Sequence, residues 1–389
     1  MTDTRRLDGV DVLRGLSILA VILLHIELRL RIAGFPLAGT MPAWLRYLLF
    51  SNGGNGVTVF FAVSGFLITR TSIRRFGSLA QMRPSRFYRI RFARIAPLLL
   101  LLLAILSVLH LGGAEGFVIP AKRATLPRAL FAALTFHLNW LEASRGFLPP
   151  NWDVLWSLSI EEMFYLFFPL LCVLLFRFRW GTTLFIVPLL AFVMVGPFQR
   201  AVWSANEIWK DKAYLSGMDG IALGCLTALL TDRLRNIRAN VWLHRLAGAT
   251  GAAMMLLVAV WPNWHWLHLI GRHGFDNTLV ALGACLVIMA TVLTGMTGNW
   301  FTAPIRWLGR HSYEVYLTHE FVVVWGTMLY AKLHSGPLPV WFIAIAALSA
   351  LPGAILARYF SEPLNRRLRG ATVTGGHNAK PEVLAENAA

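Results

Sequence analysis

The chain has 389 residues, of which 57% are hydrophobic and only 14% are charged, and its mean hydropathy is +0.59. A soluble protein carries about a quarter of its residues as charged ones, so this composition excludes an ordinary soluble fold and favours repeated membrane spans. The net charge of +17 does not indicate nucleic-acid binding, because the arginines are scattered over short loops and form no contiguous basic face. The three cysteines lie in apolar segments without metal-ligand spacing, and we expect neither a metal nor a permanently bound cofactor.

Apolar runs predict an all-α membrane protein of about ten transmembrane helices. The predicted spans lie near residues 12–31, 56–70, 92–112, 155–176, 182–198, 214–231, 243–261, 277–297, 312–331 and 338–358. The loop between the second and third spans contains eight arginines. Arginine-rich short loops stay on the cytosolic side, so we expect a multi-pass inner-membrane protein with both termini in the cytosol.

One further segment, residues 127–141, is apolar enough to suggest an eleventh span. It is short for a crossing helix, and counting it would place every later basic loop outside. We therefore expect it to form an interfacial or re-entrant helix. The domain organisation that follows is one transmembrane domain over residues 1–369 and a disordered cytosolic tail over residues 370–389.

The first predicted span holds two ionisable side chains, Arg14 and His25, which are eleven residues apart. Eleven steps of about 100° make roughly three turns, so both side chains lie on one helix face, about 16 Å apart along the axis. Ionisable groups inside a bilayer are costly, which makes each a candidate for function. We expect His25 to be catalytic and Arg14 to lie at the cytosolic mouth. The alternative is a packing histidine and an arginine that reaches the lipid headgroups.

Two acidic residues, Glu161 and Glu162, lie just inside the fourth predicted span. A carboxylate beside an imidazole orients it and stabilises its cationic form, as a general base requires. We expect one of the two to support His25, and the sequence leaves open which. The alternative is that these acids only complement the dipole at a helix N-terminus.

Two arginines, Arg91 and Arg94, enter the third predicted span three residues apart and so share a helix face. Guanidinium groups suit phosphates, which suggests a phosphate-binding site, although anchoring of the loop in the cytosol is the simpler alternative. Weaker candidates for a polar pocket are Ser64, Gly65, Ser157, Ser159, Tyr313 and His319.

Several blocks of this sequence resemble the membrane acyltransferase-3 family, which includes O-acetyltransferases of O-antigen, exopolysaccharide and related envelope glycans. The blocks occur in family order and are residues 7–25, 60–68, 91–97, 156–169, 308–319 and 359–368. The family's Arg-x10-His signature falls on Arg14 and His25, and its Arg-x-x-Arg signature falls on Arg91 and Arg94. An inserted dipeptide leaves open whether Asp8 or Asp11 takes the family's acidic position.

The resemblance implies transfer of an acyl group, acetyl in the simplest case, from cytosolic acyl-CoA to a hydroxyl of an envelope glycan or lipid-linked saccharide. It implies that Arg14, Arg91 and Arg94 hold the donor phosphates. His25 would activate the acceptor hydroxyl or carry the acyl group transiently. Two alternatives stay open: a transporter or flippase of acyl groups or lipid-linked glycans, and an acyltransferase with a small acceptor such as a macrolide.

Overall fold

The computed structural model describes residues 7–234, 240–260 and 271–370. The structure is 81% helical and contains no strand in these ranges, so the predicted all-α fold is confirmed. The tail predicted to be disordered, beyond Gly370, lies outside the described residues.

Nine helical stretches of the described chain are long and apolar enough to cross a membrane. They are α1 (Asp8–Ile32), α3 (Gly53–Phe76), α4 (Pro84–Leu111), α7 with α8 (Pro150–Asp153 and Trp156–Leu175), α9 with η3 (Gly181–Phe198 and Gln199–Trp203), α10 with α11 (Glu207–Lys212 and Tyr214–Leu234), α12 (Val241–Val260), α14 (Asp276–Thr294), and the run of α17, α18, η4 and α19 (Leu338–Leu348, Leu351–Leu356, Ala357–Ser361 and Glu362–Gly370). The remaining predicted span, 312–331, corresponds to α16 (Ser312–Leu333), which has 22 residues but is not among these nine apolar stretches. Each of the ten predicted spans therefore falls on a helix.

The segment at 127–141 does not form one continuous helix. It is divided between α5 (Leu126–Leu134) and α6 (Leu138–Arg145), which have 9 and 8 residues. The break contains Phe136, whose φ of 56° is left-handed and ends helical geometry. Two helices of about 14 and 12 Å cannot cross a hydrocarbon core of about 30 Å, in agreement with the expectation that the segment is not an eleventh span.

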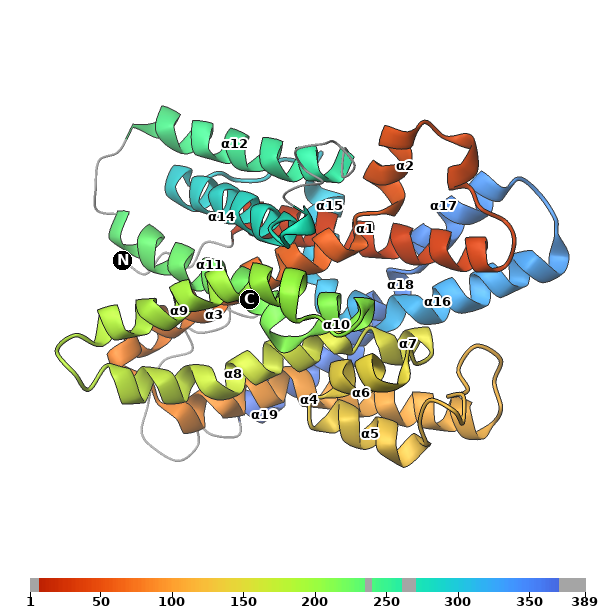
Figure 1. Ribbon diagram of the computed structural model, residues 1–389, viewed down its shortest axis with the longest axis horizontal. Helices are drawn as coiled ribbons and strands as arrows, with labels where there is room; N and C mark the ends of the chain where they lie inside the picture. The colour runs from red at the N-terminus through yellow and green to blue at the C-terminus, as the bar shows by residue number, and fades with distance from the viewer. Residues whose placement is uncertain (1–6, 235–239, 261–270, 371–389) are drawn as a thin grey trace.

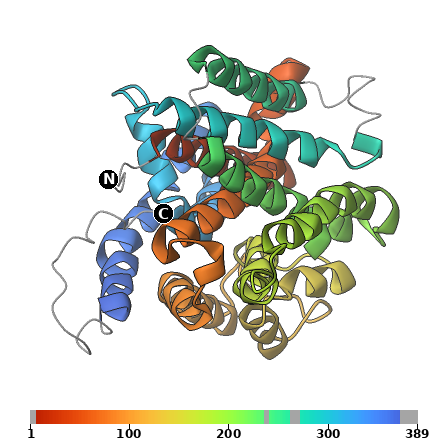
Figure 2. The same ribbon diagram turned by 90° about the vertical axis from the view of Figure 1, so that its left-hand side faces the viewer.

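The long helices pack side by side along the longest axis of the molecule (Figures 1 and 2). α1 and α3 form the interior of the bundle. In the 18-residue apolar stretch of each helix, 61% of α1 and 72% of α3 are buried, against only 17% of α12 at the edge. α1 contacts α3, α14, α15 (Ala303–Arg310) and α16. Side chains on α1 therefore face other helices, and polar groups on it need protein partners.

The start of α1 is held by ion pairs to α15. Asp8 Oδ2 lies 3.0 Å from Arg306 Nη1, and Asp11 Oδ2 lies 3.4 Å from Arg310 Nε. Both acids around the inserted dipeptide thus serve the same contact between α1 and α15. These pairs fix the depth of Arg14 one turn further along α1.

Glycines allow α3 and α11 to touch backbone to backbone. A Cβ atom on Gly65 would lie 1.9 Å from the carbonyl oxygen of Ile221, and one on Gly224 would lie 2.0 Å from the carbonyl oxygen of Ala62. Small residues at such crossings let membrane helices approach closely. Gly65 was expected in a polar pocket, but its position in the structure is this helix contact.

We predict that Gly65→Val lowers the thermal stability of the protein in detergent. The new side chain meets backbone, which cannot move aside, so the loss exceeds the roughly 1–3 kcal/mol typical of overpacking. The matched control is Gly54→Val, because Gly54 belongs to the same helix and has nothing within 4 Å of its added Cβ. Size-exclusion chromatography after heating measures both midpoints, and equal midpoints would contradict the close-packing assignment.

Candidate active site

A cavity lies between α1, α3, α4, α8 and α16, and polar side chains line much of it. Seven of the predicted site residues line this cavity: Arg14, Ser64, Arg91, Arg94, Ser157, Glu161 and Tyr313. Four further polar residues also line it: Thr71, Tyr165, Ser312 and Tyr316. Residues from five helices, far apart in the sequence, therefore converge on one polar space inside an apolar bundle.

The three predicted donor-binding arginines face this cavity but differ in their partners. Arg14 Nε donates to Ser312 Oγ over 3.1 Å, and Arg91 Nη2 donates to Glu162 Oε1 over 3.2 Å. No carboxylate of the described residues forms an ion pair with Arg94. Nearby carboxylates attract Arg94 electrostatically, but none of them bonds it directly, and a guanidinium inside a bundle is costly without a directly bound anion.

A hydroxyl pair and a carboxylate form another wall of the cavity. The hydroxyl groups of Ser64 on α3 and Tyr165 on α8 are hydrogen-bonded to each other. The guanidinium carbon of Arg91 lies 3.8 Å from the centroid of the Tyr165 ring, a cation–π contact. Glu161 lies one turn before Tyr165 on α8 and interacts with Ser64 and Arg91. The wall thus combines hydrogen-bond donors with acceptors.

Tyr316 on α16 forms the end of the cavity nearest to the histidines. Its hydroxyl accepts from Ser157 Oγ over 2.9 Å and donates to the carbonyl oxygen of Val154 over 3.0 Å. Its ring lines the cavity on one side, and its centroid is 6.0 Å from that of His319. Tyr316 therefore contacts both polar regions and stands between them.

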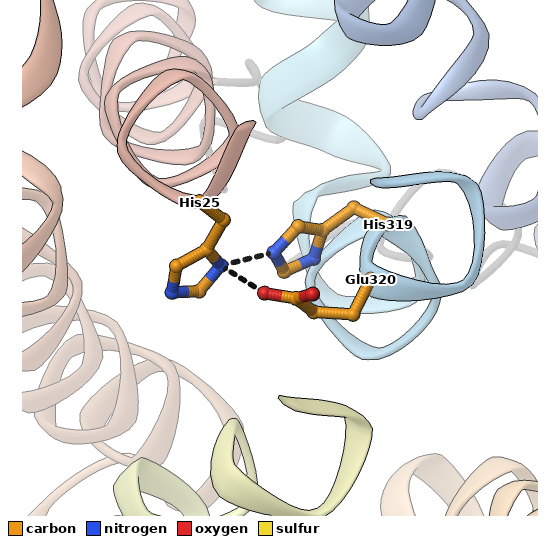
Figure 3. Close-up of side chains that lie close together, drawn as sticks. All are labelled: His25, His319 and Glu320. Carbon is orange, nitrogen blue, oxygen red and sulfur yellow. Dashed lines mark hydrogen bonds and ion pairs between the residues drawn. The ribbon is translucent and has the colours of Figure 1, made fainter. Parts of the chain in front are cut away.

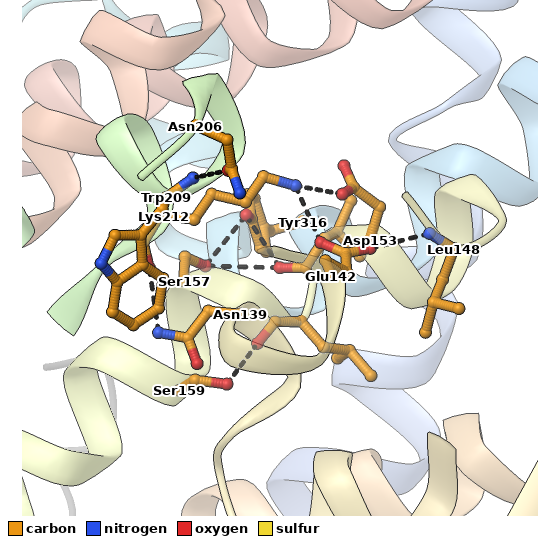
Figure 4. A network of polar contacts seen from close by, with 12 residues as sticks. Asn139, Glu142, Leu148, Asp153, Ser157, Ser159, Asn206, Trp209, Lys212 and Tyr316 are labelled. Carbon is orange, nitrogen blue, oxygen red and sulfur yellow. Dashed lines mark hydrogen bonds and ion pairs between the residues drawn. The ribbon is translucent and has the colours of Figure 1, made fainter. Parts of the chain in front are cut away.

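A buried ion cluster holds the start of α8 in place (Figure 4). Lys212 Nζ lies 2.9 Å from Glu142 Oε2 and also contacts Asp153. Glu142 is fully buried, and this cluster joins α6, α10 and the short helix α7. Because Asp153 directly precedes Val154, the cluster fixes the carbonyl group to which Tyr316 is bonded.

His25 lies outside the cavity lining, with His319 and Glu320 of α16 (Figure 3). His25 Nδ1 is 2.8 Å from His319 Nε2 and 2.7 Å from Glu320 Oε1. The two imidazole rings are parallel to within 3°, with centroids 5.1 Å apart. The side chain of His25 keeps 17% of its surface exposed, against 2% for Glu320. The partly accessible imidazole of His25 thus contacts two buried groups, the His319 ring and the Glu320 carboxylate.

The contacts between α1 and α16 place the arginines and the histidines at two levels. Arg14 meets Ser312 at one level, and His25 meets His319 at the next, so the two helices run in the same direction. The two levels are separated by about 16 Å along α1. This agrees with the predicted common face of Arg14 and His25.

The carboxylate beside His25 differs from the one that the sequence suggested. We expected Glu161 or Glu162 in this position, but Glu162 is bonded to Arg91 and Glu161 lines the cavity, while Glu320 contacts His25. A signal for Glu320 exists in the sequence, because it is an acid inside a predicted span. Spacing along one helix, however, does not show which helices pack together.

The other predicted pocket residue, Ser159, does not reach the cavity. Its hydroxyl donates to the carbonyl oxygen of Leu155 in its own helix over 3.4 Å.

His25, His319 and Glu320 have the composition of a metal site, with potential ligand atoms within 4.8 Å of one another. The distances of 2.8 Å and 2.7 Å from His25 Nδ1 to its two partners are those of hydrogen bonds.

The fold and this buried centre define a multi-pass membrane protein with a cavity lined by ionisable side chains inside its helical bundle. A family model for the acyltransferase domain matches residues 7–359, so the chain belongs to the membrane acyltransferase-3 family. It is similar to O-acetyltransferase OatA of Staphylococcus aureus strains NCTC 8325, COL and MRSA252, with 25% identity over 386 residues. The alignment covers 94% of this chain but only 58% of these relatives, so the chain spans somewhat more than half of their length. No solved structure matches the chain.

Proposed function

We propose that this protein transfers an acyl group, acetyl in the simplest case, from cytosolic acyl-CoA to a hydroxyl group of an envelope glycan or lipid-linked saccharide. The observation that carries the proposal is the two-level site: an arginine-lined cavity at one level and an accessible histidine at the next, both against α16. The family and the relatives named O-acetyltransferase support the reaction class.

The arginine-lined cavity is suited to the phosphate end of the donor. Arg94 has no carboxylate partner within the described residues, and Arg14 is bonded only to a neutral hydroxyl there. Arginine binds phosphate through two parallel, charge-assisted hydrogen bonds. Acyl-CoA is too highly charged to cross a bilayer, so its phosphates stay at the cytosolic level while the uncharged pantetheine arm extends past Tyr316 toward His25.

His25 then acts as the general base. The imidazole takes the proton of the acceptor hydroxyl while its oxygen attacks the thioester carbonyl. The tetrahedral intermediate collapses, the carbon–sulfur bond breaks, and the departing thiolate receives the proton from the imidazolium. An ester and free CoA are the products, so the proton is returned and His25 is regenerated.

The arrangement in the membrane follows from charge. The basic loop before α4 places the arginine level near the cytosol, and His25, about 16 Å further along α1, lies in the outer half. We infer that the protein resides in the bacterial inner membrane with both termini in the cytosol. The acceptor then approaches from the outer side, where envelope glycans are assembled.

His25→Ala should abolish CoA release from acetyl-CoA, because loss of a general base costs roughly two to four powers of ten in rate. The purified protein is assayed in proteoliposomes that contain envelope lipid and glycan extract from a strain lacking it. The matched control is His273→Ala, since His273 is exposed and does not line the cavity. Release of CoA by His25→Ala at the wild-type rate would remove His25 from the mechanism. A wild-type protein that releases none would favour the transporter alternative.

Arg94→Ala should weaken acetyl-CoA binding about ten- to a hundredfold, because a charge-assisted contact is worth roughly 1.5–3 kcal/mol. Arg94→Lys should restore binding only in part, since an ammonium group lacks the planar fork. Arg89→Ala is the control, because Arg89 belongs to the same helix but is exposed and outside the cavity lining. Calorimetric titration measures the three constants. Equal constants for Arg94→Ala and Arg89→Ala would mean that both arginines only anchor the loop.

A further inference from the structure

The hydrogen bonds of His319 determine where its proton resides. Its Nδ1 lies 2.8 Å from the carbonyl oxygen of Tyr316 and 3.2 Å from that of Val315. Carbonyl oxygens only accept hydrogen bonds, so Nδ1 carries the proton. In a neutral imidazole the other nitrogen, Nε2, then has a free lone pair, and this lone pair points at His25.

The contacts of His25 admit only one arrangement of protons. Its Nδ1 faces the lone pair of His319 Nε2 at 2.8 Å and the Glu320 carboxylate at 2.7 Å. A proton on His25 Nδ1 satisfies both contacts at once. If His319 were a cation and donated to His25 Nδ1, the lone pair of His25 Nδ1 would face a lone pair of the Glu320 carboxylate. If Glu320 were protonated and donated to His25 Nδ1, the lone pairs of His25 Nδ1 and His319 Nε2 would face each other. His25 is therefore protonated at Nδ1.

We propose that Nε2 of His25 is the reacting nitrogen and that Glu320 and His319 are positioning residues that hold the ring through Nδ1. The reaction at Nε2 rests on the proposed function, whereas the tautomer of His25 does not. Figure 3 shows Nε2 on the side of the ring away from both partners. The same division of labour, with one nitrogen reacting and the other held by a carboxylate, serves other general-base histidines.

The two positioning residues have different tasks. When Nε2 takes a proton, His25 becomes a cation, and the nearly fully buried carboxylate of Glu320 compensates that charge in a medium of low dielectric constant. His319 is neutral and fully buried, so it contributes orientation and not charge. Its ring is parallel to that of His25, and its own position is fixed by the two carbonyl groups of α16.

A metal ion is the competing explanation for this cluster. Ligand atoms bound tetrahedrally at about 2.1 Å from one ion stand roughly 3.4 Å apart. The observed separations of 2.8 Å and 2.7 Å are shorter and match hydrogen bonds. The distances thus favour a proton between the three groups over a divalent cation.

The tautomer is tested directly by NMR of the full-length protein labelled with ¹⁵N-histidine. The His25 signals are assigned by their loss in His25→Gln. A one-bond proton coupling at Nδ1, and none at Nε2, is the expected result and is independent of any activity. A neutral ring with its proton on Nε2 and none on Nδ1 would overturn the proposal. So would one equivalent of metal in the purified protein, found by elemental analysis and lost in His319→Ala.

The positioning role is tested by Glu320→Gln, which keeps the size of the side chain but removes its charge. We expect the CoA release rate at saturating acetyl-CoA to fall roughly ten- to a hundredfold, with the acetyl-CoA binding constant unchanged. The control is Thr318→Val, because Thr318 is buried in the same helix and its hydroxyl bonds only within that helix. A Glu320→Gln rate within twofold of the control would overturn the role of Glu320. If the wild-type protein releases no CoA at all, the proposed function fails while the NMR test of the tautomer still stands.

Discussion

The structure of this protein depends on the cost of placing ionisable side chains inside an apolar bundle. Each such group needs a partner from another helix, because lipid offers none. α1 and α16 meet this requirement together: Arg14 is bonded to Ser312, and His25 is bonded to His319 and Glu320. The two contacts fix both the depth and the rotation of the helices, and so set the distance between the two levels of the site.

The remaining helices adjust to this pair. The aspartates at the start of α1 bind arginines of α15, and glycines let α11 lie directly on α3. The cluster around Lys212 holds the start of α8, which in turn holds Tyr316. Against this background of paired groups, Arg94 lacks a carboxylate partner within the described chain. In the proposed function, the phosphates of the donor supply the anion that Arg94 lacks.

Helical spacing within the sequence predicted a large part of this arrangement. The ten predicted spans fall on helices, and Arg91 and Arg94 share the cavity as their separation of three residues implied. The partner of His25 could not be predicted in this way, because periodicity gives the face of one helix and not the neighbour that it meets. For the same reason Gly65 was expected in a pocket, although its backbone serves the contact with α11.

The proposed mechanism depends most on a continuous path from the arginine level to His25. An acyl-CoA analogue with a thioether in place of the thioester, and a photoreactive diazirine at the end of its acyl chain, would probe this path. After irradiation, mass spectrometry of the digested protein should find the probe attached within one turn of His25 on α1 and within one turn of His319 on α16. An excess of acetyl-CoA should suppress this labelling. Labelling confined to helices at the edge of the bundle, such as α12, and unaffected by acetyl-CoA would contradict the account.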